Sequence, residues 1–429
     1  MLYERWQRVA RERRHEIALK DLASGQQWTF AQLAEPPAGE KRHRGDIFYF
    51  PEGRSVRFVL TVLEAWRAGG VVCPLESGQL PPVLSQRPEA IVHFKTTSAT
   101  TGQARLVAFT AEQLAADADQ LVATMGLRAD WPNLGVISMA HSYGFSNLIL
   151  PLLLHGISLW LLDSPLPETL RRAASRMPGL TLPAVPALWR TWHDAAAIPP
   201  NVRLAISAGA PLPLALEQEV FAKSGLKIHN FYGATECGGI AYDGSATPRA
   251  ASECVGAPVK NVNLTVNDEG CLEVRGAAVG QTYWPEPESI LGRGCYQTTD
   301  LAEIKDGLVL LRGRASDQIN VAGRKVFPEL IERVLSSHPQ VRDCLVFGAP
   351  TADGGRSEVV VACVATRSEI SGESLKQFLL SRLPAWQVPR EWRLVESLAP
   401  NERGKLSRAE WRARLGFTSQ QSTSSLSDP

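Results

Sequence analysis

Apolar and polar residues alternate along most of the chain in blocks that predict helices and strands in turn. The segment 56–70 repeats apolar residues at helical spacing and ends at a glycine pair, which predicts a helix. The continuous apolar runs at 71–75 and 90–97 predict short buried strands. Further apolar runs at 134–140, 148–154, 158–163 and 202–209 continue the alternation. A helical segment at 213–225 follows them. This pattern predicts an α/β fold with substantial parallel sheet.

The N-terminal segment 4–19 sets single apolar residues among arginines and glutamates at near-helical spacing, which predicts an amphipathic surface helix. It contains no uninterrupted apolar stretch, so we do not expect a secretory signal. The longest apolar stretch, 146–162, is broken by Pro151, His155 and Gly156, so it is too short for a membrane span. We therefore expect a buried element there and no membrane-spanning segment.

The pattern changes twice in the last third of the chain. From about residue 254, short strands alternate with polar turns of the hairpin type (DEG and KDG), which predicts a smaller β subdomain. After Arg314, two helices and two strands predict a compact α+β unit. The Ser/Thr-rich end is expected to be disordered. We therefore divide the chain into domains at 1–313 and 314–415, followed by a tail at 416–429.

The amino-acid composition argues against several classes of function. The 429 residues are 44% hydrophobic and 21% charged, as in a globular protein with a large core. Lys and Arg (45) nearly balance Asp and Glu (44), which argues against a nucleic-acid-binding protein driven by bulk charge. The 7 cysteines are scattered without a C-x-x-C pair, which predicts reduced thiols in a cytoplasmic protein and neither a disulfide framework nor a zinc site.

One segment combines hydroxyl side chains with a glycine directly after a predicted strand: TTSATTGQAR at 96–105. A phosphate-binding loop needs hydroxyl donors, open backbone N–H groups and a nearby cation, because many short hydrogen bonds must hold the polyphosphate. Arg105 can supply the cation. The segment is not a Walker A loop, since it lacks G-K-[ST]. Taken alone, it is more often an ordinary turn.

Four later segments favour a phosphate-binding loop over an ordinary turn. The segment 231–236 places an aromatic ring, a hydroxyl and a carboxylate together after a strand, and 296–300 offers a carboxylate that can accept from two vicinal hydroxyls. The segment 313–319 lies at the expected domain boundary. Near the end, 400–408 presents Lys405 beside a flexible glycine.

Taken in order across 64–408, these segments resemble the motifs of the adenylate-forming superfamily of acyl-CoA synthetases, adenylation domains and luciferases. TTSATTGQAR is similar to its Ser/Thr/Gly phosphate loop, FYGATE to Y-G-x-T-E, and YQTTD to Y-x-T-G-D. GRASDQINVAGRKVFPELIE resembles its hinge and following helix, and NERGKLSR the stretch with the catalytic lysine. SAGAPLP resembles the adenine-side loop, and EAWRAGGVVCPL an upstream structural motif. The resemblance implies a large N-terminal α/β domain of parallel-sheet layers with a small β subdomain, followed by a small mobile α+β domain.

The resemblance also implies a two-step ligase reaction. A carboxylic acid attacks the α-phosphate of ATP, giving an acyl-adenylate and pyrophosphate, and a thiol then displaces AMP. The implied cofactors are ATP, Mg²⁺ and CoA, or the phosphopantetheine of an acyl carrier protein. Because the first step brings anions together, catalysis would depend on positioning and charge neutralisation.

Individual roles follow from the same resemblance. The β- and γ-phosphates would be held by the loop residues Thr97, Ser98, Thr100, Thr101, Gly102 and Arg105. Mg²⁺ would be held by Glu236 with the hydroxyl of Thr101. Tyr232 would stack on adenine beside Ala208, Gly209 and Ala210, and Gly233 and Thr235 would also contact ATP. Asp300 and Arg314 would bind the ribose hydroxyls.

Other roles concern the acid and the thiol. Lys405 would bridge the acyl carboxylate and the α-phosphate, and His141 would lie near that carboxylate. Ser316 would be the hinge. CoA would meet Gly323, Arg324 and Lys325.

The sequence departs from the family pattern at several positions. Ala99 replaces a glycine, Ala104-Arg105 replaces Pro-Lys, and Thr299 replaces the usual glycine. Ser316 stands where family members more often have Asp or Lys. The stretch between Pro74 and the phosphate loop is also short for the family, which predicts a trimmed N-terminal subdomain.

Alternatives stay open at this point. The acceptor thiol can belong to a carrier protein, and the departures are also compatible with a degenerate, non-catalytic nucleotide-binding protein. Asp300 and Arg314 can form a structural ion pair, and a lone histidine such as His141 is commonly a core residue. Cys237 is expected to pack as a small apolar residue. The pocket for the acid substrate is expected around 141–147, 207–211 and 234–240. An aryl or medium acyl group is slightly favoured as that substrate.

Overall fold

The computed structural model describes residues 1–35, 47–84, 86, 89–97, 105–350, 357–398 and 407–417. It forms two compact units, and each is described by itself. The large unit takes most of residues 1–311. The small unit takes Thr299–Leu301 and the chain from Arg312 onward. Of the predicted tail 416–429, residues 418–429 lie outside the described residues. Phe417, which was expected to be disordered, packs against Phe347 with ring centroids 6.0 Å apart.

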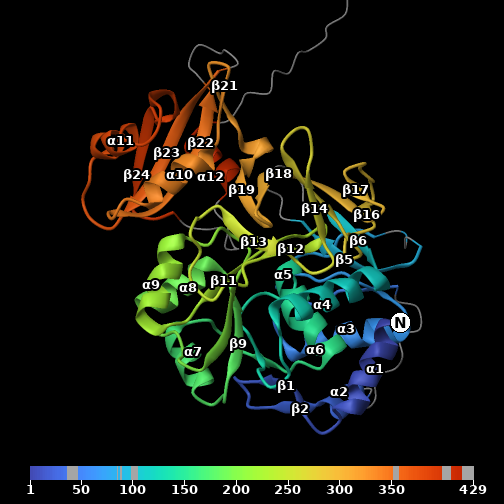
Figure 1. The fold of residues 1–429 in the computed structure, drawn as a ribbon. Coiled ribbons are helices and arrows are strands. Elements are labelled where there is room, and N and C mark those ends of the chain that lie inside the picture. The colour runs from blue at the N-terminus through green and yellow to red at the C-terminus, as the bar shows by residue number, and fades with distance from the viewer. Residues whose placement is uncertain are drawn as a thin grey trace, which may run out of the picture. The chain divides into compact units, whose positions relative to one another are not determined.

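The large unit is built on a long mixed sheet (Figure 1), in the order β14-β15-β18-β19-β13-β12-β11-β10-β9-β7-β8-β1-β2, with β17 beside β18. Strands β11, β10, β9, β7, β8 and β1 are parallel neighbours, as the alternation of apolar runs predicts. The bounds are β1 (Ile17–Asp21), β2 (Gln27–Thr29), β7 (Asn133–Gly135), β8 (Leu159–Leu161), β9 (Leu180–Ala184), β10 (Val202–Ser207), β11 (Ile228–Ala234), β12 (Gly238–Tyr242), β13 (Cys254–Pro258), β14 (Asn263–Val266), β15 (Cys271–Arg275), β17 (Leu291–Gly292), β18 (Cys295–Lys305) and β19 (Leu308–Arg314).

The strands expected as a small β subdomain are antiparallel, and they continue the main sheet through the pairing of β13 with β12. The KDG turn joins β18 to β19, with Asp306 and Gly307 both at positive φ. Two adjacent residues at positive φ are what a tight hairpin turn requires. This part of the chain therefore extends the sheet that carries the parallel strands.

A second sheet of the large unit has the order β16-β6-β5-β4-β3. Its strands are β3 (Phe48–Tyr49), β4 (Val71–Val72), β5 (Ile91–Thr96), β6 (Leu106–Thr110) and β16 (Thr282–Trp284). Strand β5 pairs antiparallel with β6, and the predicted phosphate loop connects these two strands. Strand β16 comes from far along the chain and pairs with β6.

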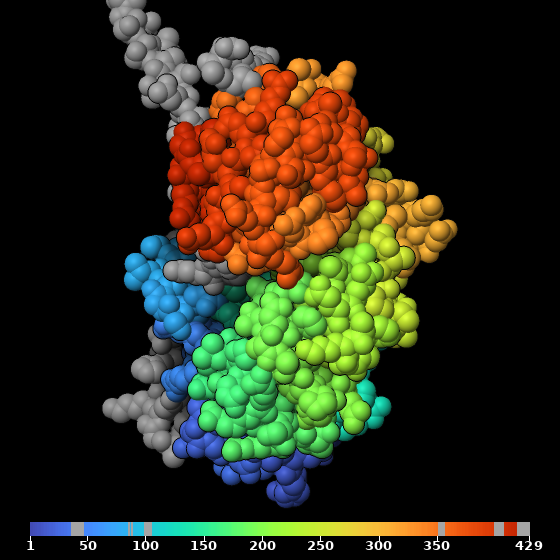
Figure 2. All heavy atoms as spheres, turned by 90° about the vertical axis from the view of Figure 1, so that its left-hand side faces the viewer, coloured from blue at the N-terminus to red at the C-terminus, as the bar shows by residue number. Residues whose placement is uncertain are grey.

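Helices of the large unit cover these sheets, and α2, α3 and α4 begin at side-chain caps. Thr110 and Gln113 form a capping box at the start of α4, which ends at Gly126 in the left-handed conformation. Gly69, the first of the predicted glycine pair, ends α3 in the same way. The helices are α1 (Leu2–Glu12), α2 (Phe30–Ala34), α3 (Val56–Ala68), α4 (Ala111–Met125), α5 (Ser142–Gly144), a π-helical turn η1 (Phe145–Ile149), α6 (Leu150–His155), α7 (Pro167–Ala174), α8 (Pro186–Asp194) and α9 (Leu214–Ser224). Helices α7 to α9 lie on the surface in Figure 2, where they are green.

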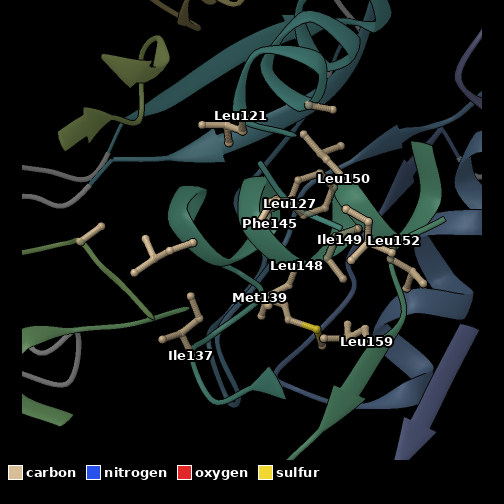
Figure 3. Close-up of a cluster of buried hydrophobic side chains, with 14 of the residues drawn as sticks. Leu121, Leu127, Ile137, Met139, Phe145, Leu148, Ile149, Leu150, Leu152 and Leu159 are labelled. Carbon is tan, nitrogen blue, oxygen red and sulfur yellow. The ribbon is translucent and has the colours of Figure 1, made fainter. Parts of the chain in front are cut away.

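The apolar run at 148–154 forms the end of η1 and helix α6 at the centre of the core. Its residues are almost completely buried, and Figure 3 shows Leu148, Ile149 and Leu152 in one cluster with Leu121 and Leu159. The proline within this run is Pro151, which lies in the first turn of α6, directly after the π-helical turn η1. No helix among the described residues is both long enough and apolar enough to cross a membrane.

The expectation of one helix over 4–19 is wrong at its C-terminal end. Helix α1 ends at Glu12, and Ile17 begins strand β1, which pairs with β8 and β2. Trp6, Val9 and Ala10 are buried in the core, so the apolar face of α1 is packed inside the protein. Short-range helical spacing misplaced Ile17 because a single apolar residue fits the period of a strand as well as that of a helix.

The small unit has its own sheet, in the order β22-β23-β24, and its own apolar clusters. A hairpin, β20–β21, precedes the sheet. The helices and strands expected after Arg314 are confirmed. The elements are η2 (Ala315–Asp317), β20 (Ile319–Val321), β21 (Arg324–Val326), α10 (Pro328–Ser336), β22 (Val341–Pro350), β23 (Glu358–Thr366), α11 (Gly372–Leu380), η3 (Ala385–Gln387), β24 (Glu391–Val395) and α12 (Arg408–Arg414).

Candidate functional site

Several predicted segments follow the carboxyl ends of parallel strands, which is where α/β sheets bind ligands. Ala208, Gly209 and Ala210 follow β10, and Thr235 and Glu236 follow β11. Within β11 lie Tyr232 and Gly233, and the loop after β7 leads to His141 at the start of α5. Since β7, β9, β10 and β11 are neighbours, these segments share one edge of the sheet.

The carboxylate of Glu236 is held in place by one tyrosine. The hydroxyl of Tyr283 donates to Oε1 of Glu236 at 2.9 Å, and the backbone N–H of Gly280 donates to the carbonyl oxygen of Glu236 at 2.7 Å. Burial and the neighbouring charge of Glu236 raise the pKa of Tyr283, so its hydroxyl keeps the proton that it donates. The segment 280–283 therefore fixes both the side chain and the backbone of Glu236.

Arg105 lies over the ring of the same tyrosine. Its guanidinium carbon is 3.9 Å from the centroid of the Tyr283 ring, and it forms an ion pair with Glu288. Partial burial opposes its charge, but Glu288, Tyr283 and Glu236 together raise the pKa of Arg105 above its usual value. A cation and a carboxylate thus flank one ring, close to the strand end that carries the predicted phosphate loop.

The base of that loop is closed by two hydrogen bonds. The backbone N–H of Thr97 donates to the carbonyl oxygen of Arg105 at 2.8 Å, and the N–H of Arg105 donates to Oγ1 of Thr97 at 3.0 Å. The structure therefore links Thr97, Arg105 and Glu236 through Tyr283. The remaining predicted loop residues lie outside the described residues, as does the predicted catalytic lysine: Ser98, Thr100, Thr101, Gly102 and Lys405.

His141 is a partly exposed residue, so it is not a core histidine. Its Nε2 lies 3.1 Å from Oε1 of Glu76. Two residues later, Tyr143 is half-buried, with its hydroxyl 3.4 Å from the carbonyl oxygens of Ala184 and Ile206. Burial raises the pKa of Tyr143 well above its usual value. Its ring centroid is 6.1 Å from that of Phe231, so two aromatic rings lie beside the segment that carries His141.

All seven cysteines are free thiols, as expected. Cys237, next to Glu236, is buried, and this burial raises its pKa well above the usual value. A thiol that stays protonated is a poor nucleophile, so Cys237 packs as a small apolar residue. Burial also raises the pKa of Cys73 to about 12 and that of Cys363 to about 11.

In the small unit, Asp300 and Arg314 lie together. Nε of Arg314 donates to Oδ1 of Asp300 at 2.9 Å. The aspartate side chain is 14% exposed and the arginine side chain 45%. An ion pair of this kind can support the structure, and it can equally hold the carboxylate in place for two sugar hydroxyls.

The segment after Arg314 contains the predicted hinge and the predicted CoA-binding residues. Ser316 lies in the turn η2, and Gly323 lies between β20 and β21 with φ of +83°. The backbone N–H of Gly323 donates to Oδ1 of Asn320 at 2.9 Å. Arg324 and Lys325 are exposed, and the guanidinium of Arg324 is 5.4 Å from the ring centroid of Trp386.

A charged cluster that the sequence did not reveal anchors helix α12, which follows the segment with Lys405. Arg408 contacts Asp317 at 2.6 Å, Glu332 at 2.8 Å and Glu329 at 3.0 Å. Burial, followed by the charge of Glu329, raises the pKa of Glu332 to about 6, although Arg408 opposes this shift. The cluster ties the turn η2 to helices α10 and α12.

Sequence reasoning also missed Tyr283 and a second buried cluster, Lys95–Asp117–Ser146. A lysine inside the buried strand 90–97 was the one available signal for that cluster. Tyr283 gave no signal, because its contact with Glu236 joins residues that are far apart in the sequence.

Two family models match the chain. The model of the AMP-binding enzymes matches residues 77–284, and the model of the AMP-binding enzyme C-terminal domain matches residues 330–405. The first match runs from before β5 to β16 and includes the turn with Glu236, and the second runs from within α10 to the segment with Lys405.

Curated relatives are acid ligases. The chain is 27% identical over 378 residues to the malonate–CoA ligase ACSF3 of Mus musculus, covering 76% of this chain and 65% of that protein. It is 30% identical over 298 residues to the anthranilate–CoA ligase of Pseudomonas aeruginosa (64% and 57%). It is 30% identical over 236 residues to the fatty acid–[acyl-carrier-protein] ligase ScoC of Streptomyces coeruleorubidus (50% and 45%). The chain thus spans less than two thirds of the length of each of these relatives.

Solved structures share the fold. ATP-bound MatB from Rhodopseudomonas palustris matches with a TM-score of 0.82 and 22% identity, covering 96% of this chain and 99% of that chain. The o-succinylbenzoate CoA synthetase MenE of Bacillus subtilis, in complex with ATP and magnesium, matches with a TM-score of 0.80 and 20% identity (95% and 98%). With both family models in the order that the motifs require, the chain belongs to the AMP-binding enzymes of the adenylate-forming superfamily.

Proposed function

We propose that the protein is an ATP- and Mg²⁺-dependent acid–thiol ligase, which forms an acyl-adenylate with release of pyrophosphate and then a thioester with CoA. The observation that carries the proposal is the arrangement around Tyr283. One ring holds the carboxylate of Glu236 by a hydrogen bond and the guanidinium of Arg105 by stacking, at the base of a Ser/Thr-rich loop. A carboxylate for a metal and a cation for phosphates are both needed to bring two anions together.

The donor set around Glu236 fits Mg²⁺. Among the described residues no group of three or more His, Cys, Asp or Glu side chains could hold a metal ion by itself. Mg²⁺ is usually held by one or two carboxylates together with substrate phosphates and water. Glu236, with the hydroxyl of Thr101, would supply the protein ligands, and the bound ion would neutralise phosphate charge.

The rest of the nucleotide would contact three segments. The phosphates would meet Arg105 and the loop residues Thr97, Ser98, Thr100, Thr101 and Gly102. Adenine would lie against Tyr232, Gly233 and Thr235 on one side and Ala208, Gly209 and Ala210 on the other. Asp300 would accept from the ribose hydroxyls, and Arg314, 2.9 Å away, would orient its carboxylate.

In the first step, a carboxylate oxygen of the acid attacks the α-phosphorus, and the bond to the leaving pyrophosphate breaks. Lys405 would neutralise both the carboxylate and the α-phosphate. His141, whose Nε2 is already paired with Glu76, would border the acid. In the second step, the thiol sulfur attacks the acyl carbon and AMP leaves.

The second step would need the small domain. We propose a division into an ATP- and acid-binding domain, 1–313, and a lysine-bearing domain, 314–415, that rotates about Ser316. Gly323, Arg324 and Lys325 would then meet CoA, and the two exposed cations suit its phosphates.

A carrier protein is the second candidate acceptor, and similarity to a fatty acid–[acyl-carrier-protein] ligase favours it. Thioester formation should be assayed with acyl-adenylate and either CoA or a phosphopantetheinylated carrier. Thioester on the carrier alone would overturn the CoA assignment.

For the acid, we propose an aryl or medium acyl group. The aromatic pair Tyr143–Phe231 beside His141 supports this choice, as does the similarity to an anthranilate–CoA ligase. The substrate class should be tested by measuring pyrophosphate release with a panel of aryl, medium-chain and dicarboxylic acids.

The central test is acid-dependent exchange of labelled pyrophosphate into ATP. We expect exchange with at least one acid of the panel, and a loss of about a hundredfold in Lys405→Ala, because that variant lacks the charge that neutralises the reacting anions. No exchange with any acid would favour a non-catalytic nucleotide-binding protein.

A further inference from the structure

A buried charged cluster lies in the large unit and has no part in the proposed chemistry. Nζ of Lys95 donates to Oδ2 of Asp117 and to Oγ of Ser146, both at 3.1 Å, and Oγ of Ser146 donates to the same Asp117 oxygen at 2.6 Å. The side chains of Lys95 and Asp117 are each 2% exposed. Nζ also lies 4.7 Å from the ring centroid of Phe109.

Stability alone does not call for this cluster. A buried ion pair loses the hydration of both charges, and well-packed apolar side chains are often as stabilising or more so. The surroundings are apolar, with Val107, Phe109, Leu121 and Phe145 all buried in the same core. A charged cluster in such a place is better suited to fixing the relative positions of the elements that contribute to it, because its hydrogen bonds are directional.

The first of these elements leads into the phosphate loop. Lys95 is in β5, two residues before Thr97, whose hydrogen bonds with Arg105 close the base of the loop. His93, on the same face of β5, is buried, and its ring lies 4.3 Å from that of Phe145. Burial and the charge of Lys95 lower its pKa well below the usual value, so it stays neutral. Of these two residues on one face of β5, Lys95 is therefore the one that carries the positive charge.

The second element carries the metal carboxylate. Gly238, two residues after Glu236, has a φ of +70°, and a β-carbon built on it would lie 2.3 Å from Oδ1 of Asp117. The backbone therefore passes directly over the carboxylate of Asp117. That oxygen has no hydrogen-bond partner among the described residues.

The third element is the π-helical turn that contributes Ser146. This turn directly follows α5, which contains Tyr143. Single π-helical turns often occur at functional sites, where they re-aim side chains. The hydroxyl of Ser146 joins this turn to β5 and α4 at one point.

From these contacts we infer that Lys95, Asp117 and Ser146 are positioning residues, which hold the base of the phosphate loop at Thr97 and the Glu236 turn in the arrangement that binds Mg·ATP. The inference rests on the proposed function. It has a specific consequence. Loss of the cluster should weaken the binding of ligands that carry the β- and γ-phosphates and the metal, and should leave the binding of a ligand without them nearly unchanged.

The test compares Mg·ATP with AMP. The variant Lys95→Met/Asp117→Asn removes both charges together, so that neither is left buried without its partner. Asp119→Asn is the control on the same helix, since Asp119 pairs with Arg5 and has no contact with the cluster. Both dissociation constants should be measured by calorimetry for the full-length wild type and each variant, with a melting curve for each.

We expect the double variant to bind Mg·ATP about tenfold more weakly, with AMP binding changed by less than about twofold, and the control to match the wild type. Equally weaker binding of both ligands, or unchanged binding of both, would overturn the inference.

If the double variant does not fold, the Ser146→Ala variant provides the test instead. It removes one hydroxyl, and we expect about a threefold loss for Mg·ATP alone. A wild-type chain that binds neither nucleotide would overturn the proposed function, and the inference with it.

Discussion

At the scale of single residues, Tyr283 would act on the proposed chemistry through Glu236, because its hydroxyl donates to one oxygen of that carboxylate at 2.9 Å. In Tyr283→Phe, the carboxylate loses this donor and is held less firmly. We expect the Mg²⁺ concentration for half-maximal pyrophosphate exchange to rise about fivefold, since a hydrogen bond to a charged group contributes about 1.5–3 kcal/mol and part of that loss is recovered by water.

Tyr242→Phe is the matched control for this substitution. Tyr242 is also buried, and its ring stacks on His229 with centroids 5.5 Å apart. It should leave the Mg²⁺ dependence at the wild-type value. Equal Mg²⁺ dependence in Tyr283→Phe and the wild type would mean that Tyr283 does not orient Glu236.

Residues with strong local patterns could be predicted from the sequence, and residues that act through long-range contacts could not. Glu236 and Arg105 stand in recognisable motifs. Tyr283 lies 47 positions away from Glu236, and nothing near it in the sequence indicates that contact. The same applies to Arg408, whose partner Asp317 is 91 positions away.

At the scale of elements, the helix α10 should make stability depend on pH through Glu332. Burial raises the pKa of this carboxyl group from 4.5 to about 6 in the folded protein, so the folded state binds its proton more tightly than the unfolded state. This contribution is fully present below pH 4.5 and is lost as the pH rises to about 6. The loss should be about 1 kcal/mol, since the Glu332 side chain is still 19% exposed.

The measurement is the free energy of unfolding of the wild type and of Glu332→Gln at several pH values. The glutamine cannot titrate, so the difference between the two proteins should change between pH 4.5 and 6 and stay constant above pH 6.5. A difference that does not vary with pH would contradict the raised pKa. Glu373→Gln, on α11, is the exposed control and should show no such loss of stability with rising pH.

The sequence predicted the existence and type of most elements it singled out, and their ends less well. Helix α3 was predicted well because Ser55 and Gly69 cap its ends. The apolar run at 134–140 contains only the short strand Asn133–Gly135, because the following residues form the loop that leads to His141. Ile17 was placed in a helix because its strand β1 pairs, from Leu19 onward, with β8, which is far away in the sequence.

At the scale of the whole molecule, the two units have separate apolar cores. The core of the large unit runs from Leu2 to Val309, and the clusters of the small unit begin at Ile319. Separate cores allow the units to unfold in separate steps. Leu375→Ala, at a fully buried position of the small unit, should destabilise that unit by about 2–5 kcal/mol, because it leaves a cavity.

Differential scanning calorimetry of the full chain tests this expectation. We expect two transitions in the wild type, with only one of them shifted to lower temperature in Leu375→Ala. Leu182→Ala, at a fully buried position of the large unit, should shift the other transition. A single transition that moves as a whole in both variants would show that the units unfold together.

The burial of most of the seven cysteine thiols has a practical consequence for labelling experiments. Five of them are buried, and burial holds several in the protonated, unreactive form. A thiol introduced on the surface of each unit would therefore react with fluorescent dyes well ahead of these five. A pair of such dyes would test, one molecule at a time, the proposed rotation about Ser316 between the two proposed reaction steps.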